Sequence, residues 1–158
     1  MELTPEQISL LKDLMTRSAK KGNLANAGLV LENNKLLASA ESWVASSCDA
    51  TAHSERMLVT MVCNLKHANY TPGLIMVSVV EPCTMCMSAC SQAGLKKIAY
   101  IIPAKRFIEK IAWMSDTTKI DKHQLASQYS EPLKLVHLSN YEEEFCQIFE
   151  KVMSHLLK

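Results

Sequence analysis

Apolar and polar residues recur along the chain with periods that predict helices alternating with strands. Thr4 and Gln7, with a proline between them, occupy the positions of an N-terminal capping box, and apolar residues follow at helical spacing. Two strand-like runs, 27–32 and 35–40, flank Asn33-Asn34, whose side chains tolerate the positive φ angles of a tight hairpin. The first 40 residues therefore predict a helix followed by a two-stranded hairpin.

From His53 the apolar period returns to that of a helix, which continues to about residue 65. Residues 74–80 are apolar on both faces, as is typical of a central, fully buried strand. A short helix over about 84–93 and a strand over 97–102 follow. Strands that alternate with helices in this way predict a mixed sheet covered on both faces.

The pattern is less regular between residues 103 and 132. Apolar residues at 107–112 predict one helix, and a second, weaker helix is predicted near 122–129. Residues 133–138 predict a last strand, which we expect to run parallel to the strand before it because the connection is long enough to hold a helix. Ser139 and Glu142 then match a second capping box at the start of a final amphipathic helix.

Composition places this chain among globular proteins. Its 158 residues are 48% hydrophobic and 21% charged, so we expect a single domain over residues 1–158. Seventeen basic and sixteen acidic side chains give a net charge of +1, which does not favour a uniform basic face for a phosphate backbone. The longest apolar stretch, 74–80, is far shorter than the roughly 20 residues of a membrane helix. No secretory signal is visible, so the six cysteines predict reduced thiols in a cytoplasmic protein.

Two short motifs carry candidate chemistry, and each lies where a loop or strand gives way to a helix. The first is His53-Ser54-Glu55, and the second is Pro82-Cys83-Thr84-Met85-Cys86. The spacing of Cys83 and Cys86 places both sulfurs on one side of a turn, which is a common way to hold two thiolates on one Zn²⁺. His53 would add a third ligand. Three protein ligands leave the fourth tetrahedral position open, as catalytic zinc sites do.

Glu55 has a separate role in this interpretation. A water activated by zinc needs a group that accepts its proton and later delivers protons to the substrate. A carboxylate two residues from His53 is suited to that shuttle. The order H-x-E and then P-C-x-x-C is a signature of zinc nucleobase deaminases.

Residues 51–55 and 81–86 closely resemble the motifs of the cytidine and deoxycytidylate deaminase superfamily, in the branch that holds tRNA adenosine deaminase, guanine deaminase and cytosine deaminase. The resemblance covers about residues 5–102 in order and spacing. It implies an α/β fold, a three-layer αβα sandwich with a five-stranded mixed sheet. It also implies zinc bound by His53, Cys83 and Cys86, Glu55 as the proton shuttle, and a homodimer or higher homo-oligomer.

The chain departs from this branch in one place. Relatives carry an Asn just after the second strand, where it hydrogen-bonds the substrate, but Val44 stands at that position here. A serine two or three positions further on could replace it, or the substrate is an unusual one. Asn26, just before the first strand, is a second candidate substrate contact. Trp113 and Asp116 lie where relatives place aromatic and acidic substrate contacts.

Simpler interpretations exist for the cysteines. A redox C-x-x-C pair would leave His53 and Glu55 without a role. Cys90 as a fourth ligand would make the site structural, but it lies one turn after Cys86, about 6 Å further along the helix axis, and we expect it to be a small buried hydrophobe. Cys48 is expected to be an incidental thiol.

We therefore expect a hydrolase of cyclic amidine C–N bonds: a zinc-dependent deaminase that releases ammonia from a small amino-substituted ring, a nucleobase or nucleoside such as guanine or cytosine. Its near-zero net charge does not favour a nucleic-acid partner, and no membrane partner is expected. Two alternatives stay open. One is a tRNA adenosine deaminase that edits A to I, and the other is a catalytically silent, zinc-bound partner subunit in which Glu55 would have no function.

Overall fold

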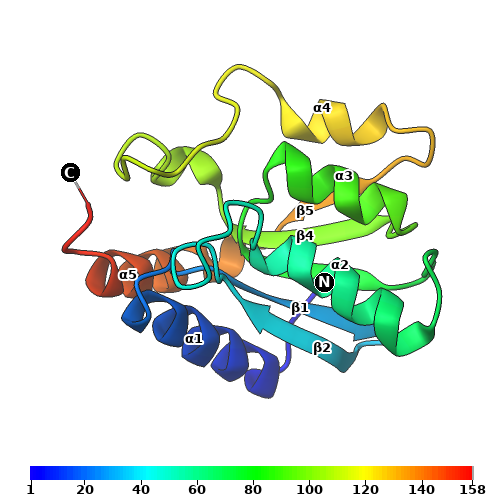
Figure 1. Ribbon diagram of the computed structural model, residues 1–158, viewed down its shortest axis with the longest axis horizontal. Helices are drawn as coiled ribbons and strands as arrows, with labels where there is room; N and C mark the ends of the chain where they lie inside the picture. Colours follow the sequence, from blue (N-terminus) through cyan, green and yellow to red (C-terminus); the bar gives the residue numbers. More distant parts are fainter. Residues whose placement is uncertain (158) are drawn as a thin grey trace.

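The computed structural model describes residues 1–157 and contains a five-stranded mixed sheet with helices on both faces (Figure 1). The strands are β1 (Ala27–Glu32), β2 (Lys35–Glu41), β3 (Ile75–Val80), β4 (Lys97–Ile102) and β5 (Lys134–His137), and their order in the sheet is β2-β1-β3-β4-β5. β1 pairs antiparallel with β2 and β3, whereas β3, β4 and β5 are parallel. The predicted three-layer αβα sandwich and the parallel last pair of strands are confirmed.

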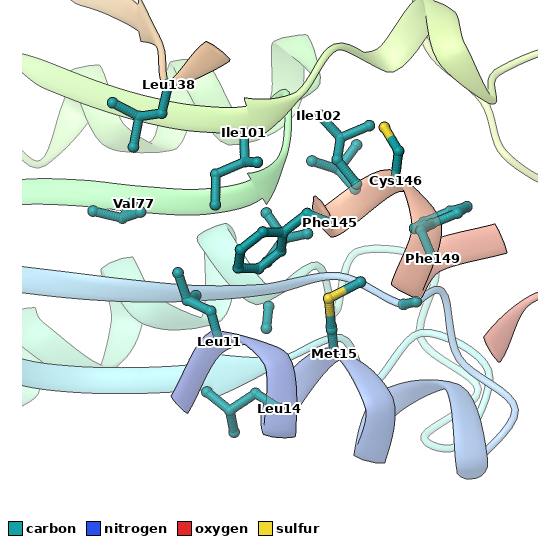
Figure 2. Packing of buried hydrophobic residues seen from close by; sticks show 14 of the residues in the cluster. Leu11, Leu14, Met15, Val77, Ile101, Ile102, Leu138, Phe145, Cys146 and Phe149 are labelled. Atoms are coloured by element: carbon teal, nitrogen blue, oxygen red, sulfur yellow. The ribbon is translucent and has the colours of Figure 1, made fainter. Parts of the chain in front are cut away.

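The helices divide between the two faces of the sheet. α1 (Pro5–Lys20) and α5 (Glu142–Val152) cover one face, and α2 (Ser54–Lys66), α3 (Thr84–Gln92) and α4 (Lys122–Ser127) cover the other (Figure 1). Short 3₁₀ turns, η1 (Ala104–Arg106) and η2 (Ser139–Tyr141), follow β4 and β5. Figure 2 shows Leu11 and Met15 of α1 meeting Phe145 and Phe149 of α5 beneath the sheet, in one of two apolar cores.

The predicted elements before residue 103 agree with the structure to within one or two residues. Thr4 Oγ1 accepts a hydrogen bond from the backbone N–H of Gln7, and Gln7 Oε1 accepts one from the N–H of Thr4, so the capping box is formed. Asn33 and Asn34 have φ angles of 50° and 64°. These two residues form the tight hairpin that the sequence predicts.

The predicted helix over residues 107–112 is wrong, because the chain forms successive turns there, directly after η1. Phe107 and Ile111 are buried as the apolar pattern requires. Phe107 reaches the core by stacking on Phe149, with ring centroids 4.2 Å apart. Two buried residues four positions apart, such as Phe107 and Ile111, are compatible with a helix or with turns. Here their contacts with the core outweigh helix propensity, and the segment forms turns.

The predicted second capping box is also absent. Helix α5 begins at Glu142, and its N-cap, Tyr141, makes no side-chain hydrogen bond to the helix. Ser139 instead lies in η2. The Glu142 carboxylate lies 2.9 Å from Nε2 of His137, at the end of β5, and is not engaged in capping.

Sheet pairing brings several element ends to one edge. The start of β1, the end of β2 and the end of β3 meet there because β1 is antiparallel to both neighbours. Helices α2 and α3 both begin at this edge, which therefore collects the two chemical motifs (Figure 1). No helix among the described residues is long and apolar enough to span a bilayer.

Candidate active site

The fold brings the two motifs together. His53 Nδ1 lies 3.5 Å from the sulfur of Cys83 and 3.6 Å from the sulfur of Cys86. The three ligand atoms all lie within 4.8 Å of one another, in a group formed by these residues alone. One imidazole nitrogen and two sulfurs are donors that Zn²⁺ prefers, so this group could hold a zinc ion.

Each ligand candidate is placed by the start of a helix. His53 is the N-cap of α2 and Cys83 is the N-cap of α3, and neither side chain caps its own helix. Cys86 lies one turn into α3 and is fully buried. Cys83 has an extended backbone conformation, with a φ of −75° and a ψ of 169°, and the chain enters α3 from it. The positive ends of both helix dipoles favour anionic sulfur at this point.

The two cysteines interact strongly in the protein alone. The hydrogen bond from the Cys86 thiol, helped by one from His53, lowers the pKa of Cys83 to about 4. The same bond and burial raise the pKa of Cys86. The hydrogen bond to Cys83 raises the pKa of His53, against the effect of burial. The lowered pKa favours the thiolate form of Cys83, which is the form that binds metal.

Glu55 lies beside this group in the first turn of α2 and is 2% exposed. Its Oε1 accepts hydrogen bonds from Asn26 Nδ2 at 3.2 Å and from Ser78 Oγ at 2.8 Å. Its Oε2 accepts one from Ser54 Oγ at 3.0 Å and lies 3.9 Å from the sulfur of Cys86. These donors fix the carboxylate in one orientation next to the three ligand candidates.

A cavity of about 210 Å³ opens onto His53, Glu55 and Cys83. Its walls come from the start of β1, the end of β2, the end of β3 and the segment 113–116. Most of the wall is apolar, from Leu24, Val44, Ala50, Val80, Trp113 and Met114. The site thus combines a mostly apolar pocket with a small set of polar groups, as small-molecule sites do.

The three candidate substrate contacts all line this cavity, but two of them are already engaged. Asn26 donates to Glu55 and accepts from the backbone N–H groups of Ala27 and Val80. Its amide therefore holds Glu55 and joins β1 to β3. Trp113 is 44% exposed at the mouth of the cavity.

Asp116 is engaged by a buried lysine. Its Oδ2 accepts a hydrogen bond from Lys122 Nζ at 2.5 Å, and its Oδ1 accepts one from the N–H of Thr117. Both carboxylate oxygens therefore already accept a hydrogen bond from the protein.

Val44, the residue at the family's Asn position, lines the cavity with an apolar side chain. Neither of the serines considered as replacements lines the cavity. Ser46 is bonded to Asn23, and Ser47 Oγ donates to the Trp43 carbonyl. Ser42, which was not predicted from the sequence, lines the cavity instead.

Sequence reasoning also missed the residues that support the site. Asn23 is 1% exposed, and its Oδ1 accepts the N–H groups of both Ala45 and Ser46, which shapes the loop after β2. Ser78 was detectable as a lone polar residue in an apolar strand. Lys122 gave no sequence signal, because a lysine at the start of a helix is usually solvated.

The remaining cysteines lie apart from the candidate ligands. Cys90 is fully buried, with its sulfur 3.7 Å from that of Met76, and burial raises its pKa. Cys48 is exposed. Neither belongs to the metal-binding group, which agrees with the three-ligand expectation.

The sequence profile of the family described as the cytidine and deoxycytidylate deaminase zinc-binding region matches residues 1–102. A tRNA-specific adenosine deaminase of Aquifex aeolicus is 24% identical over 84 residues, which is 53% of this chain and 56% of that protein. One from Agrobacterium fabrum is 36% identical over 52 residues, or 33% of this chain and 34% of that protein. The matches thus span about half, or less, of these relatives.

Solved structures share the fold over nearly the whole chain. A guanine deaminase from Nitrosomonas europaea superposes with a TM-score of 0.79 at 15% identity, covering 98% of this chain and 87% of that chain. A structure from work on A-to-I editing by tRNA:A34 deaminases superposes with a TM-score of 0.74 at 18% identity, covering 92% and 99%. At these identities the likeness concerns the fold alone.

Proposed function

Because the chain belongs to the cytidine and deoxycytidylate deaminase zinc-binding family, we propose that it is a zinc-dependent hydrolytic deaminase of a small amino-substituted ring. One observation carries the proposal. The Glu55 carboxylate, held by three side-chain donors, lies beside the His53, Cys83 and Cys86 group and faces the same cavity. That arrangement places a proton carrier next to a metal-binding group in a small pocket.

The residues present fit a zinc ion. Nδ1 of His53 and the sulfurs of Cys83 and Cys86 would hold it, since their donor types and mutual distances match what zinc requires. A zinc ion bound there lowers the pKa of water, so that hydroxide is available near neutral pH.

Glu55 moves the protons of the reaction. It accepts a proton from the attacking water as a C–O bond forms at the amino-bearing ring carbon. It delivers this proton to the ring nitrogen, then takes the second proton from the new hydroxyl group and passes it to the amino group, so that a carbonyl forms, the C–N bond breaks and ammonia leaves. Asn26, Ser54 and Ser78 keep the carboxylate aimed at the cavity throughout these transfers.

The size and lining of the cavity favour a free base such as guanine or cytosine, or a small nucleoside. Its volume of about 210 Å³ lies below the roughly 300 Å³ at which pockets for drug-sized ligands begin. Val44 offers no hydrogen bond where nucleoside-reading relatives place an amide, and Asp116 is engaged by Lys122. Apolar contact with the ring, including the indole of Trp113, supplies most of the binding.

A tRNA adenosine deaminase is the second candidate, because both curated relatives carry that activity in their names. An open groove of about 380 Å³ also lies over His53, Cys83 and Met85, next to the cavity, where the rest of a nucleotide could lie. Binding of tRNA would use several lysine and arginine contacts to phosphates. Here Lys12, Arg17, Lys66 and Arg106 lie in ion pairs with carboxylates, which favours the small ring.

We further propose a single deaminase domain over residues 1–158 that acts in nucleobase metabolism in the cytoplasm as a homodimer. The stripe of Met57, Met61 and Leu65 supports the dimer. These residues repeat every four positions along α2, and Met61 and Leu65 are 37% and 56% exposed. A second copy of the chain that packs on this stripe would bury its exposed apolar side chains.

Ammonia release from a panel of bases, nucleosides, nucleotides, pterins and a tRNA anticodon stem-loop tests the proposal. We expect turnover of a small ring that varies little between about 50 and 200 mM salt, since few phosphate contacts contribute. Turnover of the stem-loop that collapses over this salt range would establish the second candidate instead. No turnover of any compound by the zinc-loaded protein would favour a silent partner subunit.

A further inference from the structure

Lys122 is a buried lysine that the proposed reaction does not use. Its side chain is 5% exposed at the start of α4. Its Nζ donates to the Pro82 carbonyl at 3.1 Å and to Asp116 Oδ2 at 2.5 Å, and lies 3.5 Å from Glu81 Oε1. An ammonium group carries three N–H donors, so these three acceptors satisfy it without any ligand.

The acceptors belong to two separate parts of the pocket. Glu81 and Pro82 form the link between β3 and Cys83, and Asp116 belongs to the segment 113–117. The other carboxylate oxygens are also engaged, since Glu81 Oε2 accepts the N–H of Ala104 and Asp116 Oδ1 that of Thr117. The ammonium group of Lys122 therefore joins residues 81–82, which lead to Cys83, to the segment 113–117. We call the segment 113–117 the pocket wall.

The pocket wall has few other attachments. Between residues 115 and 121 no backbone N–H in the described chain reaches a backbone carbonyl. Trp113 and Ile120 are 44% and 51% exposed, and the apolar contact of this stretch with the core comes from the partly buried Met114. The wall nevertheless faces both His53 and Cys83 across the cavity and the adjoining groove.

We propose that Lys122 is a positioning residue that holds the pocket wall over the metal-binding group and so sets the width of the substrate pocket. The inference rests on the proposed function only in naming the pocket a substrate pocket. Without the cation, the carboxylates of Glu81 and Asp116 would lose the positive charge that they share, and their mutual repulsion would move the wall away. The lysine thus controls the pocket through Asp116 and Glu81 without touching the ring.

Lys122→Met tests this, since it removes the charge and keeps a long apolar side chain. In the zinc-loaded variant we expect faster hydrogen exchange at the amides of Met114 and Thr117, whose N–H groups bond to the Ile111 carbonyl and to Asp116 Oδ1, and unchanged exchange in α1 and α5. We also expect KM for the ring substrate to rise roughly tenfold while kcat changes much less, because a displaced wall weakens binding in the ground and transition states alike. Lys122→Arg keeps the positive charge, and we expect its amide exchange and its KM to lie close to those of the wild-type protein.

Lys66→Met is the matched control, because it breaks an exposed ion pair with Glu32 at 2.7 Å on the far end of α2. It should leave exchange at the amides of Met114 and Thr117, and KM, unchanged. Unchanged exchange of the wall in Lys122→Met would overturn the inference, as would an equal effect of the control. If Lys122→Met does not fold, Asp116→Asn removes the negative charge of the Lys122–Asp116 ion pair. Amide exchange of the pocket wall must then become faster in that variant. Exchange is measured without substrate, so a failure of the deaminase proposal is recognised separately.

Discussion

At the scale of single residues, Glu55 and its donors explain how a glutamate is kept at the base of a pocket. A buried carboxylate needs hydrogen bonds, and Asn26, Ser54 and Ser78 provide them. Each donor comes from a different part of the chain: the start of β1, the start of α2 and the interior of β3. The orientation of the Glu55 carboxylate therefore depends on the packing of α2 against the sheet.

Glu55→Gln is expected to retain zinc and fold while turnover falls by at least about 100-fold, since the amide keeps the size of the side chain but cannot carry the proton. Ammonia release and metal content measured on the same preparation check this. Ser127→Ala serves as the control, because its hydroxyl bonds only within α4 and away from the cavity. Loss of zinc in Glu55→Gln would contradict the shuttle role and make Glu55 a ligand.

At the scale of elements, the site depends on where helices begin and end. α2 and α3 start at the metal-binding group, and α3 ends at Gln92, two residues before Gly94, which has a φ of 81°. A left-handed residue of this kind closes a helix and turns the chain into the next strand, here β4. The segment after β4 is different, because side-chain anchors and the Lys122 cluster place it in the absence of a regular helix.

Gly94→Ala is expected to destabilise the protein by more than about 1 kcal/mol, because an alanine at this φ is strained and its Cβ would lie 2.3 Å from Tyr70 Cε2. Chemical denaturation measures the change. Gly22→Ala is the matched control, since Gly22 has a φ of 86° at the end of α1 and no atom within 4 Å of the added Cβ. Equal losses in both variants would show that the Tyr70 contact adds nothing to the cost of the φ angle.

At the scale of the whole molecule, the candidate ligands join two helices on the same face of the sheet. His53 begins α2 and Cys83 begins α3, so a zinc ion shared by them connects segments 30 positions apart. Binding of metal to the folded chain alone stabilises the fold through linkage.

Chelation of zinc is expected to lower Tm by about 5–10 °C. This follows from about 2.7 kcal/mol of stabilisation when free zinc exceeds Kd 100-fold and from about 2–4 °C per kcal/mol for a chain of this size. Scanning calorimetry with and without chelator checks it. Cys83→Ser should lose both zinc and the shift, whereas Cys48→Ser, at an exposed site outside the metal-binding group, should keep them. A protein purified without chelator that holds no zinc would refute the metal site.

The sequence by itself determined the order of the elements, the parallel last strands and the residues of the two motifs, because these depend on local periodicity and short spacings. The meeting of His53 with Cys83 and Cys86 was expected from their types and is realised in the fold. Tertiary structure alone decided the rest. Residues 107–112 form turns because their core contacts outweigh helix propensity. Asp116 faces a buried lysine because the start of α4 lies against Glu81 and Pro82, just after β3, and a contact between distant segments leaves no local pattern in the sequence.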